Sequence, residues 1–156
     1  MKAVTVSVLK KELKHHTQEE LIEICLKLAK FKKENKELLT YILFDATDED
    51  TYVREIKDEV DEAFSKLNHD SLYYVKKSVR KILRLIKKYI RYSKKKETEA
   101  DLLLHFCAKL KELKPTHKKS LQMVNIYERQ LNMAKKAIDS LHEDLQYDFH
   151  LMLEEL

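Results

Sequence analysis

The chain has 156 residues and a net charge of +4 at pH 7, with 44% hydrophobic and 37% charged residues. Glycine is absent and proline occurs once, which excludes the glycine-rich loops of P-loop and dinucleotide-binding proteins and argues against a β-rich fold with tight hairpin turns. These features predict one all-α domain spanning residues 1–156. We expect an irregular multi-helix bundle or an array of antiparallel helix pairs, with six to eight helices and no cofactor.

The N-terminal part of the chain begins with a short predicted helix over residues 7–15. Thr17 and Glu20 then form a capping-box pattern that opens a second helix, in which the Thr17 hydroxyl accepts from the backbone of Glu20. Asn35 is predicted to end that helix and to cap the next. Apolar residues of the second helix follow the spacing of one helix face and are predicted to be buried: Leu21, Ile24, Cys25, Leu28 and Phe31.

The next predicted helix is acidic on one side. Thr47 to Asp50 form its start signal, because acidic residues are favoured in the first turn of a helix. Its apolar side carries Val53, Ile56, Val60, Ala63, Phe64 and Leu67. A carboxylate stripe lies opposite and comprises Glu55, Asp58, Glu59 and Glu62.

The helix that follows residue 70 carries the clearest charge signal in the chain. Eleven Lys or Arg residues and no Asp or Glu lie between Lys76 and Lys96. At 100° per residue, an apolar stripe is formed by Leu72, Val75, Val79, Ile82, Leu83, Ile86 and Ile90. The face opposite that stripe is predicted to carry Lys77, Arg80, Lys81, Arg84, Lys87, Lys88 and Arg91.

This basic face admits several interpretations. It is typical of a solvated surface, of a site for an acidic partner protein, and of a nucleic-acid-binding surface, since phosphate contacts are electrostatic. Tyr73, Tyr74 and Tyr92 lie beside the cations and suit base stacking, although no recognised nucleic-acid motif is present. We expect the acidic and basic stripes to point away from each other and to give a polarised surface.

The C-terminal half is predicted to start a helix at Thr98 and to end it before Pro115. From Leu121 to Leu145 the apolar residues form a heptad-like seam. A capping-box pattern over residues 140–143 predicts a break in that long helix. If the helix instead projects, a symmetric homodimer would cover the seam.

The positions of the Cys, His and carboxylate residues in the sequence give little indication of a catalytic or metal site. Cys107, like Cys25, lies on an apolar stripe, where a thiol is expected to be inert. His142, His150 and Asp144 are the candidate ligands for an alternative function, a carboxylate/His metal-binding bundle, although their spacing is not that of a zinc site. No residue set meets the requirements of a catalytic site, so we expect no enzymatic activity.

These patterns predict a cytoplasmic binding or scaffolding module without a membrane-spanning helix, because the longest apolar run covers only residues 38–44. Segments 9–14 (LKKELK), 17–23 (TQEELIE) and 141–148 (LHEDLQYD) resemble a small uncharacterised family of bacterial all-helical proteins. That family has no assigned activity, so the resemblance implies an all-α fold and transfers no function.

Overall fold

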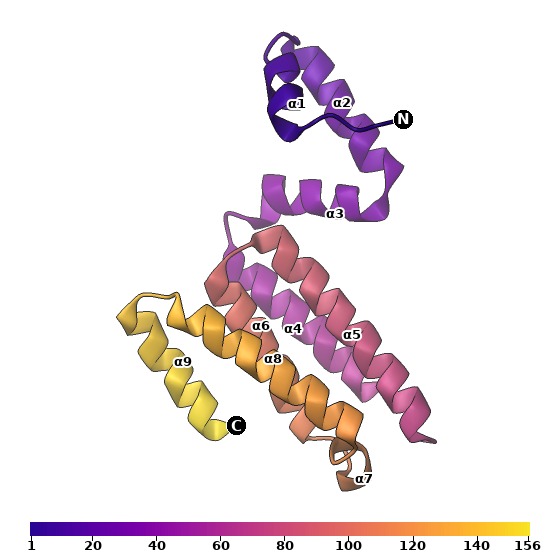
Figure 1. The fold of residues 1–156 in the computed structure, drawn as a ribbon, viewed down its shortest axis with the longest axis vertical. Helices are drawn as coiled ribbons and strands as arrows, with labels where there is room; N and C mark the ends of the chain where they lie inside the picture. The colour runs from indigo at the N-terminus through magenta and orange to yellow at the C-terminus, as the bar shows by residue number, and fades with distance from the viewer. The chain divides into compact units, whose positions relative to one another are not determined.

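The computed structural model describes all 156 residues, and the fold is all-α, as predicted. Eight helices have seven or more residues, and a ninth is a single short turn. Length alone predicts one domain, whereas the contacts divide the chain into two compact units. We call Met1–Phe44 the N-terminal unit and Asp45–Leu156 the C-terminal unit (Figure 1). No helix is both long and apolar enough to cross a membrane.

The N-terminal unit contains α1 (Val6–Leu13), α2 (Gln18–Phe31) and α3 (Lys33–Thr40), after which a π-helical turn covers Tyr41–Asp45. The predicted capping box is confirmed. The Thr17 hydroxyl accepts from the Glu20 backbone N–H at 3.2 Å, and the Glu20 carboxylate accepts from the Thr17 N–H at 2.8 Å. Two otherwise unsatisfied backbone donors at the start of α2 are thus paired.

Two expectations for this unit are wrong. Asn35 does not cap α3 but lies inside it, where its Nδ2 donates to the Leu28 carbonyl at 2.8 Å. The apolar face of α2 is not buried: Leu21 and Ile24 are half-buried, and Cys25, Leu28 and Phe31 are exposed. The reason is the lack of a covering element, since neither α1 nor α3 contributes a buried residue.

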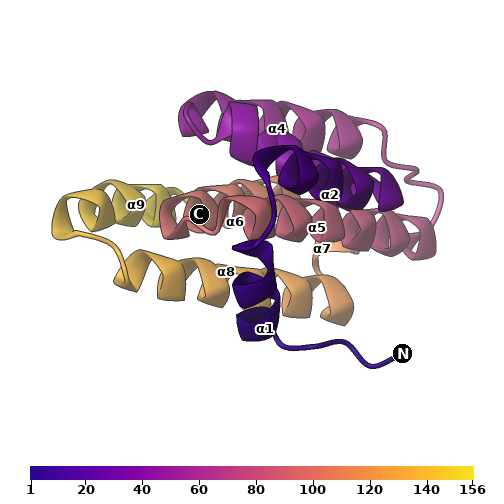
Figure 2. The ribbon, with the colours of Figure 1, turned by 90° about the horizontal axis from the view of Figure 1, so that it is seen from above.

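The C-terminal unit contains α4 (Glu49–Ser65), α5 (Leu72–Ser93), α6 (Lys96–Lys111), α7 (Pro115–Lys118), α8 (Leu121–Asp139) and α9 (Glu143–Glu155). Helix α6 is the centre of this unit and contacts α4, α5, α8 and α9. Figure 2 shows α6 between α4 on one side and α8 on the other. The outer helices therefore need one apolar face each, whereas α6 needs apolar residues on more than one side.

The composition of α6 follows from this central position. Leu102, Leu103 and Leu104 are consecutive and all at most 2% exposed, so more than half of the helix circumference is packed. Phe106 and Cys107 are fully buried as well, and the Phe106 ring lies 5.9 Å from that of Phe64 in α4. The apolar periodicity of this segment predicts a single buried stripe, and the prediction misses Leu104. Its members are Leu102, Leu103, Phe106, Cys107, Leu110 and Leu113.

The corner between α5 and α6 is held to the start of α4 by Glu49. Its carboxylate accepts from the Thr98 hydroxyl at 2.6 Å and from the Ser93 hydroxyl, and it pairs with the Lys95 ammonium at 3.0 Å. Thr98 is only 2% exposed. Helix α6 begins at Lys96, so Thr98 lies inside its first turn and does not start it. The buried Thr98 hydroxyl is satisfied by its hydrogen bond to Glu49.

The predicted break near residue 140 is confirmed, but a different residue caps the last helix. Ser140 is the C-cap of α8 and donates its hydroxyl to the Ala137 carbonyl at 2.7 Å. His142 is the N-cap of α9, and its Nδ1 accepts from the Asp144 N–H at 3.3 Å. Helix α9 packs against α6 and α8 and buries Phe149. Helix α8 packs on α6 and buries Ala134 and Ile138, so part of the heptad-like seam is covered within the chain.

Candidate binding face on helix α5

Helix α5 forms as its sequence predicts. The Ser71 hydroxyl accepts from the Tyr74 N–H at 3.4 Å at its start. The apolar stripe faces the interior, where Val75, Val79 and Ile86 are fully buried. The helix ends at Lys94, which has φ 58° and donates its N–H to the Ile90 carbonyl at 2.8 Å. Because the apolar stripe faces the interior, the residues on the opposite side of α5 face outward.

The seven predicted cations lie on the outer side of α5. Five are exposed and two, Lys87 and Lys88, are half-buried. The Lys88 ammonium lies 4.9 Å from the centroid of the Tyr89 ring. The other six make no ion pair: Lys77, Arg80, Lys81, Arg84, Lys87 and Arg91. Because α5 carries no acidic residue, neighbouring cations on this face repel one another.

The carboxylates of α4 do not neutralise these six cations. All four residues of the acidic stripe are exposed. Glu59 accepts from the Tyr89 hydroxyl at 2.9 Å, and Glu62 pairs with Lys66 of its own chain segment. The hydrogen bond and the charge of Lys66 lower the pKa of Glu62. The contact between Glu59 and Tyr89 lies at the flank of α5, so the outer row of cations has no intramolecular counter-charge.

The three tyrosines beside the cations differ in accessibility. Tyr73 and Tyr74 are 64% and 48% exposed, and their ring centroids are 5.4 Å apart in an edge-on arrangement. Tyr92 is half-buried and lies 6.1 Å from Tyr89. Only the pair at the start of α5 therefore offers open aromatic surface.

The candidate metal ligands lie at the surface of α9 and do not form a cluster. His142, Asp144 and His150 are all exposed. His142 Nδ1 lies 3.5 Å from the nearest Asp144 carboxylate oxygen, in the helix cap described above. No group of three or more His, Cys, Asp or Glu residues in the chain is arranged to hold a metal ion.

The two cysteines have opposite surroundings. Cys107 is fully buried, and burial raises the pKa of its thiol to about 12. A thiol with so high a pKa is almost wholly protonated at neutral pH and is a poor nucleophile. Cys25 is exposed on α2, so its predicted burial is wrong.

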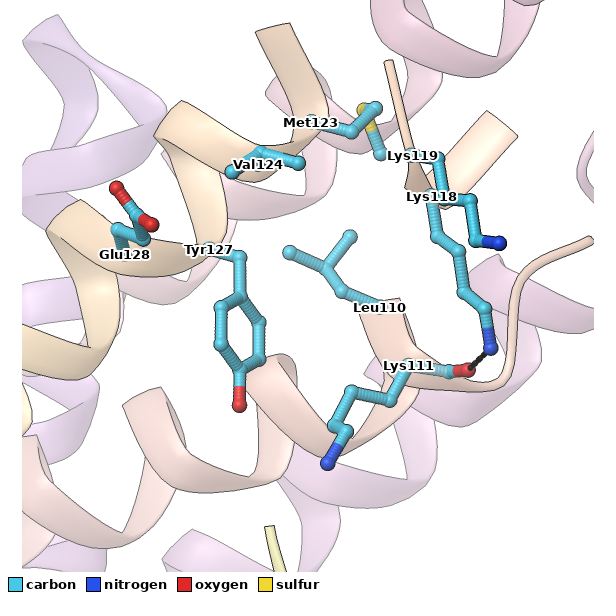
Figure 3. A pocket seen from close by; sticks show the side chains of 8 residues that line it. All are labelled: Leu110, Lys111, Lys118, Lys119, Met123, Val124, Tyr127 and Glu128. Atoms are coloured by element: carbon cyan, nitrogen blue, oxygen red, sulfur yellow. Dashed lines mark hydrogen bonds between the residues drawn. The ribbon is translucent and has the colours of Figure 1, made fainter. Parts of the chain in front are cut away.

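One hollow was not predicted from the sequence, because its lining comes from three separate segments. It lies between the end of α6, α7 and the first half of α8, and has a volume of about 280 Å³. Figure 3 shows Leu110 and Tyr127 facing it, with lysines at its edge. Lys118 Nζ donates to the Lys111 carbonyl at 3.1 Å. Most of its wall is apolar, and its charged lining residues are Lys111, Lys118, Lys119 and Glu128.

No protein-family model, curated protein sequence or solved structure matches the chain.

Proposed function

We propose that the protein is a non-enzymatic binding or scaffolding module whose α5 face engages an acidic segment of a partner protein. The observation that carries this proposal is the row of six cations that make no ion pair, on a helix without a single carboxylate. A row of like charges destabilises an isolated helix, and an acidic partner would relieve that repulsion.

The shape of this row suits an extended or helical acidic partner. Lys77 and Arg91 are fourteen residues apart on one continuous helix, which corresponds to about 21 Å along its axis. Four helical turns thus present cations at regular intervals. Guanidinium groups at Arg80, Arg84 and Arg91 suit two-pronged hydrogen bonding to carboxylates.

Nucleic acid is the second candidate, and the exposed Tyr73–Tyr74 pair favours it. Aromatic rings next to a basic groove or ridge bind single strands by stacking, without sequence preference. Single-stranded nucleic acid would use the tyrosine rings for stacking, whereas an acidic peptide binds through its carboxylates and does not need the tyrosines.

The test is fluorescence anisotropy with two labelled probes, poly-L-glutamate and a single-stranded oligonucleotide, at low and at physiological salt. We expect poly-L-glutamate to bind the full chain at low salt and to weaken as salt rises. The double variant Arg80→Glu/Arg84→Glu should weaken it about tenfold or more. The matched control is Lys135→Glu/Lys136→Glu, which changes net charge equally at two exposed positions of α8.

The outcomes separate the candidates. Binding of neither probe at low salt contradicts both. Oligonucleotide binding that Tyr73→Ala/Tyr74→Ala weakens, without binding of poly-L-glutamate, replaces the acidic partner with nucleic acid. Equal weakening by the α5 and α8 variants would show that net charge, rather than the α5 face, governs binding.

We also propose a cytoplasmic location for this function. Both cysteines are free, and one of them is exposed. Free thiols at the surface persist in reducing compartments and are oxidised outside them.

A further inference from the structure

One face of α2 in the N-terminal unit, centred on Cys25, is apolar and mostly exposed, although Ala29 on the same face is buried and Leu21 is half-buried. Along the helix, seven residues of α2 precede Cys25 and six follow it. Around the helix, Ile22 and Leu28 flank Cys25 three residues away on either side, and they are 51% and 57% exposed. Leu26 and Phe31, at 48% and 77%, lie on opposite flanks of this face, about 100° and 120° around the helix from Cys25.

The N-terminal unit has no core that would account for these residues. Among the residues before Asp45, only Ala29 and Tyr41 are buried. Helix α1 adds more uncovered apolar surface through Val6, Val8, Leu9 and Leu13. An apolar surface of this extent in a small unit marks an interaction site.

Its size reaches one half of a protein–protein interface only when α1 is included. The exposed fractions of the four large apolar residues of α2 add up to about 2.3 fully exposed side chains, and those of the four residues of α1 to about 2.2. By area, the two helices together correspond to roughly 300–500 Å² of apolar surface, so α2 alone supplies about half of it. A standard interface buries about 800 Å² on each partner, of which about 60% is apolar.

We propose that this face binds the same face of a second copy of the chain, with the two α2 helices antiparallel and Cys25 next to the two-fold axis. This proposal concerns a different surface from α5 and does not depend on it. In this arrangement Ile22 of one copy packs against Leu28 of the other, and each Cys25 lies near its counterpart. The same surface serves on both copies, as a two-fold interface requires.

The charges at the edge of the face favour an antiparallel pair. Glu19 and Lys30 are eleven residues apart, about three helical turns, so they border the same edge at opposite ends of α2. Both are exposed, and neither makes an ion pair within the chain. Antiparallel packing brings Glu19 of one copy to Lys30 of the other, whereas parallel packing would oppose like charges.

A membrane surface is a poorer occupant for the same face. Glu19, Glu20 and Glu23 lie in the first two turns of α2, where an anionic lipid surface would repel them. A second copy supplies lysines at that end instead. The observations therefore favour self-association.

The test is sedimentation equilibrium of the full chain across micromolar concentrations. We expect a dimer, with Leu28→Glu raising its Kd about a hundredfold, because the two-fold axis places both new carboxylates in one apolar interface. Leu151→Glu is the matched control, since Leu151 of α9 is 46% exposed and lies on the other unit. It should change the Kd less than about threefold.

A charge swap tests the orientation. Lys30→Glu should weaken the dimer, and Glu19→Lys/Lys30→Glu should restore it. Circular dichroism confirms that each variant keeps its helical content. A general loss of folding would not be rescued by the second substitution.

Cross-linking tests the axis directly in the unaltered protein. A short bis-maleimide alkylates one thiol on each copy, and should yield a species of about twice the 18.7 kDa chain mass. Cys107 is buried and should not react, so Cys25→Ser should abolish the product. A monomer throughout the concentration range, a dimer unaffected by Leu28→Glu, or a dimer without the Cys25 cross-link would each overturn the proposal.

Discussion

The N-terminal and C-terminal units are built from similar amphipathic helices but differ in what covers the apolar faces. In the C-terminal unit, α4, α5, α8 and α9 all turn their apolar faces towards α6. In the N-terminal unit no helix has this central position, and residues such as Phe31 stay 77% exposed. An apolar periodicity therefore predicts that a helix forms. Whether its apolar face is buried depends on a neighbouring helix, which the same pattern does not identify.

The largest effect should come from removing a central aromatic ring in one unit and an exposed one in the other. Phe106→Ala should lower the free energy of unfolding by about 3–5 kcal/mol, because it leaves a cavity inside α6's packing. Phe31→Ala should cost less than about 0.5 kcal/mol. Urea unfolding followed by circular dichroism, at concentrations too low for self-association, measures both. Equal losses would contradict the contrast between the units.

An intermediate effect is expected from the Glu49 contacts. Glu49→Ala removes the acceptor of the buried Thr98 hydroxyl and should cost about 1–3 kcal/mol. The comparison is Glu23→Ala on the exposed side of α2, which should stay within about 0.5 kcal/mol. Glu49→Gln keeps an oxygen acceptor, so it should lower the free energy of unfolding less than Glu49→Ala does in the same assay. Equal losses of unfolding free energy for Glu49→Gln and Glu49→Ala would show that the carboxylate charge matters more than the Thr98 contact.

The smallest effect concerns helix ends, and a gain in stability is expected in the C-terminal unit only. Lys94 is the only residue with positive φ, a conformation that glycine adopts without steric cost. Lys94→Gly should therefore raise the free energy of unfolding by about 0.5–1 kcal/mol. Lys32, at the end of α2, has φ −142°, which any residue adopts. Lys32→Gly should give no gain in thermal or urea unfolding, and an equal gain would refute the role of φ.

Much of the fold could be predicted from periodicity and capping. The Thr17–Glu20 box, the inward stripe of α5 and the break near residue 140 depend on local interactions, and all three are confirmed. The positions of individual caps were less predictable. His142 rather than Ser140 caps α9, because the Ser140 hydroxyl donates to the Ala137 carbonyl at the end of α8.

Burial and tertiary contacts were less accessible to sequence reasoning. Cys25 and Cys107 lie on comparable apolar stripes, yet one is exposed and the other buried. Thr98 looks like a helix cap from its neighbours, but its hydroxyl meets Glu49 across 49 residues of chain. The hollow beside Tyr127 combines side chains from α6, α7 and α8, and no local pattern relates them.

For the basic face, the pattern predicted which side of α5 carries the cations. It did not determine whether the α4 carboxylates reach them, since that depends on the rotation of α4 about its own axis. Glu59 meets Tyr89 at the flank, and Glu62 meets Lys66. What binds the outer row remains a prediction.

The position of α6 has a dynamic consequence. Backbone amides of a helix exchange with solvent only when the elements around it open. Since α6 is enclosed by helices from both earlier and later parts of the chain, fraying at α9 or at the start of α4 uncovers one of its sides and leaves the others packed. Its amides become accessible only when the whole C-terminal unit comes apart, so the slowest-exchanging hydrogens of the protein belong to its middle helix.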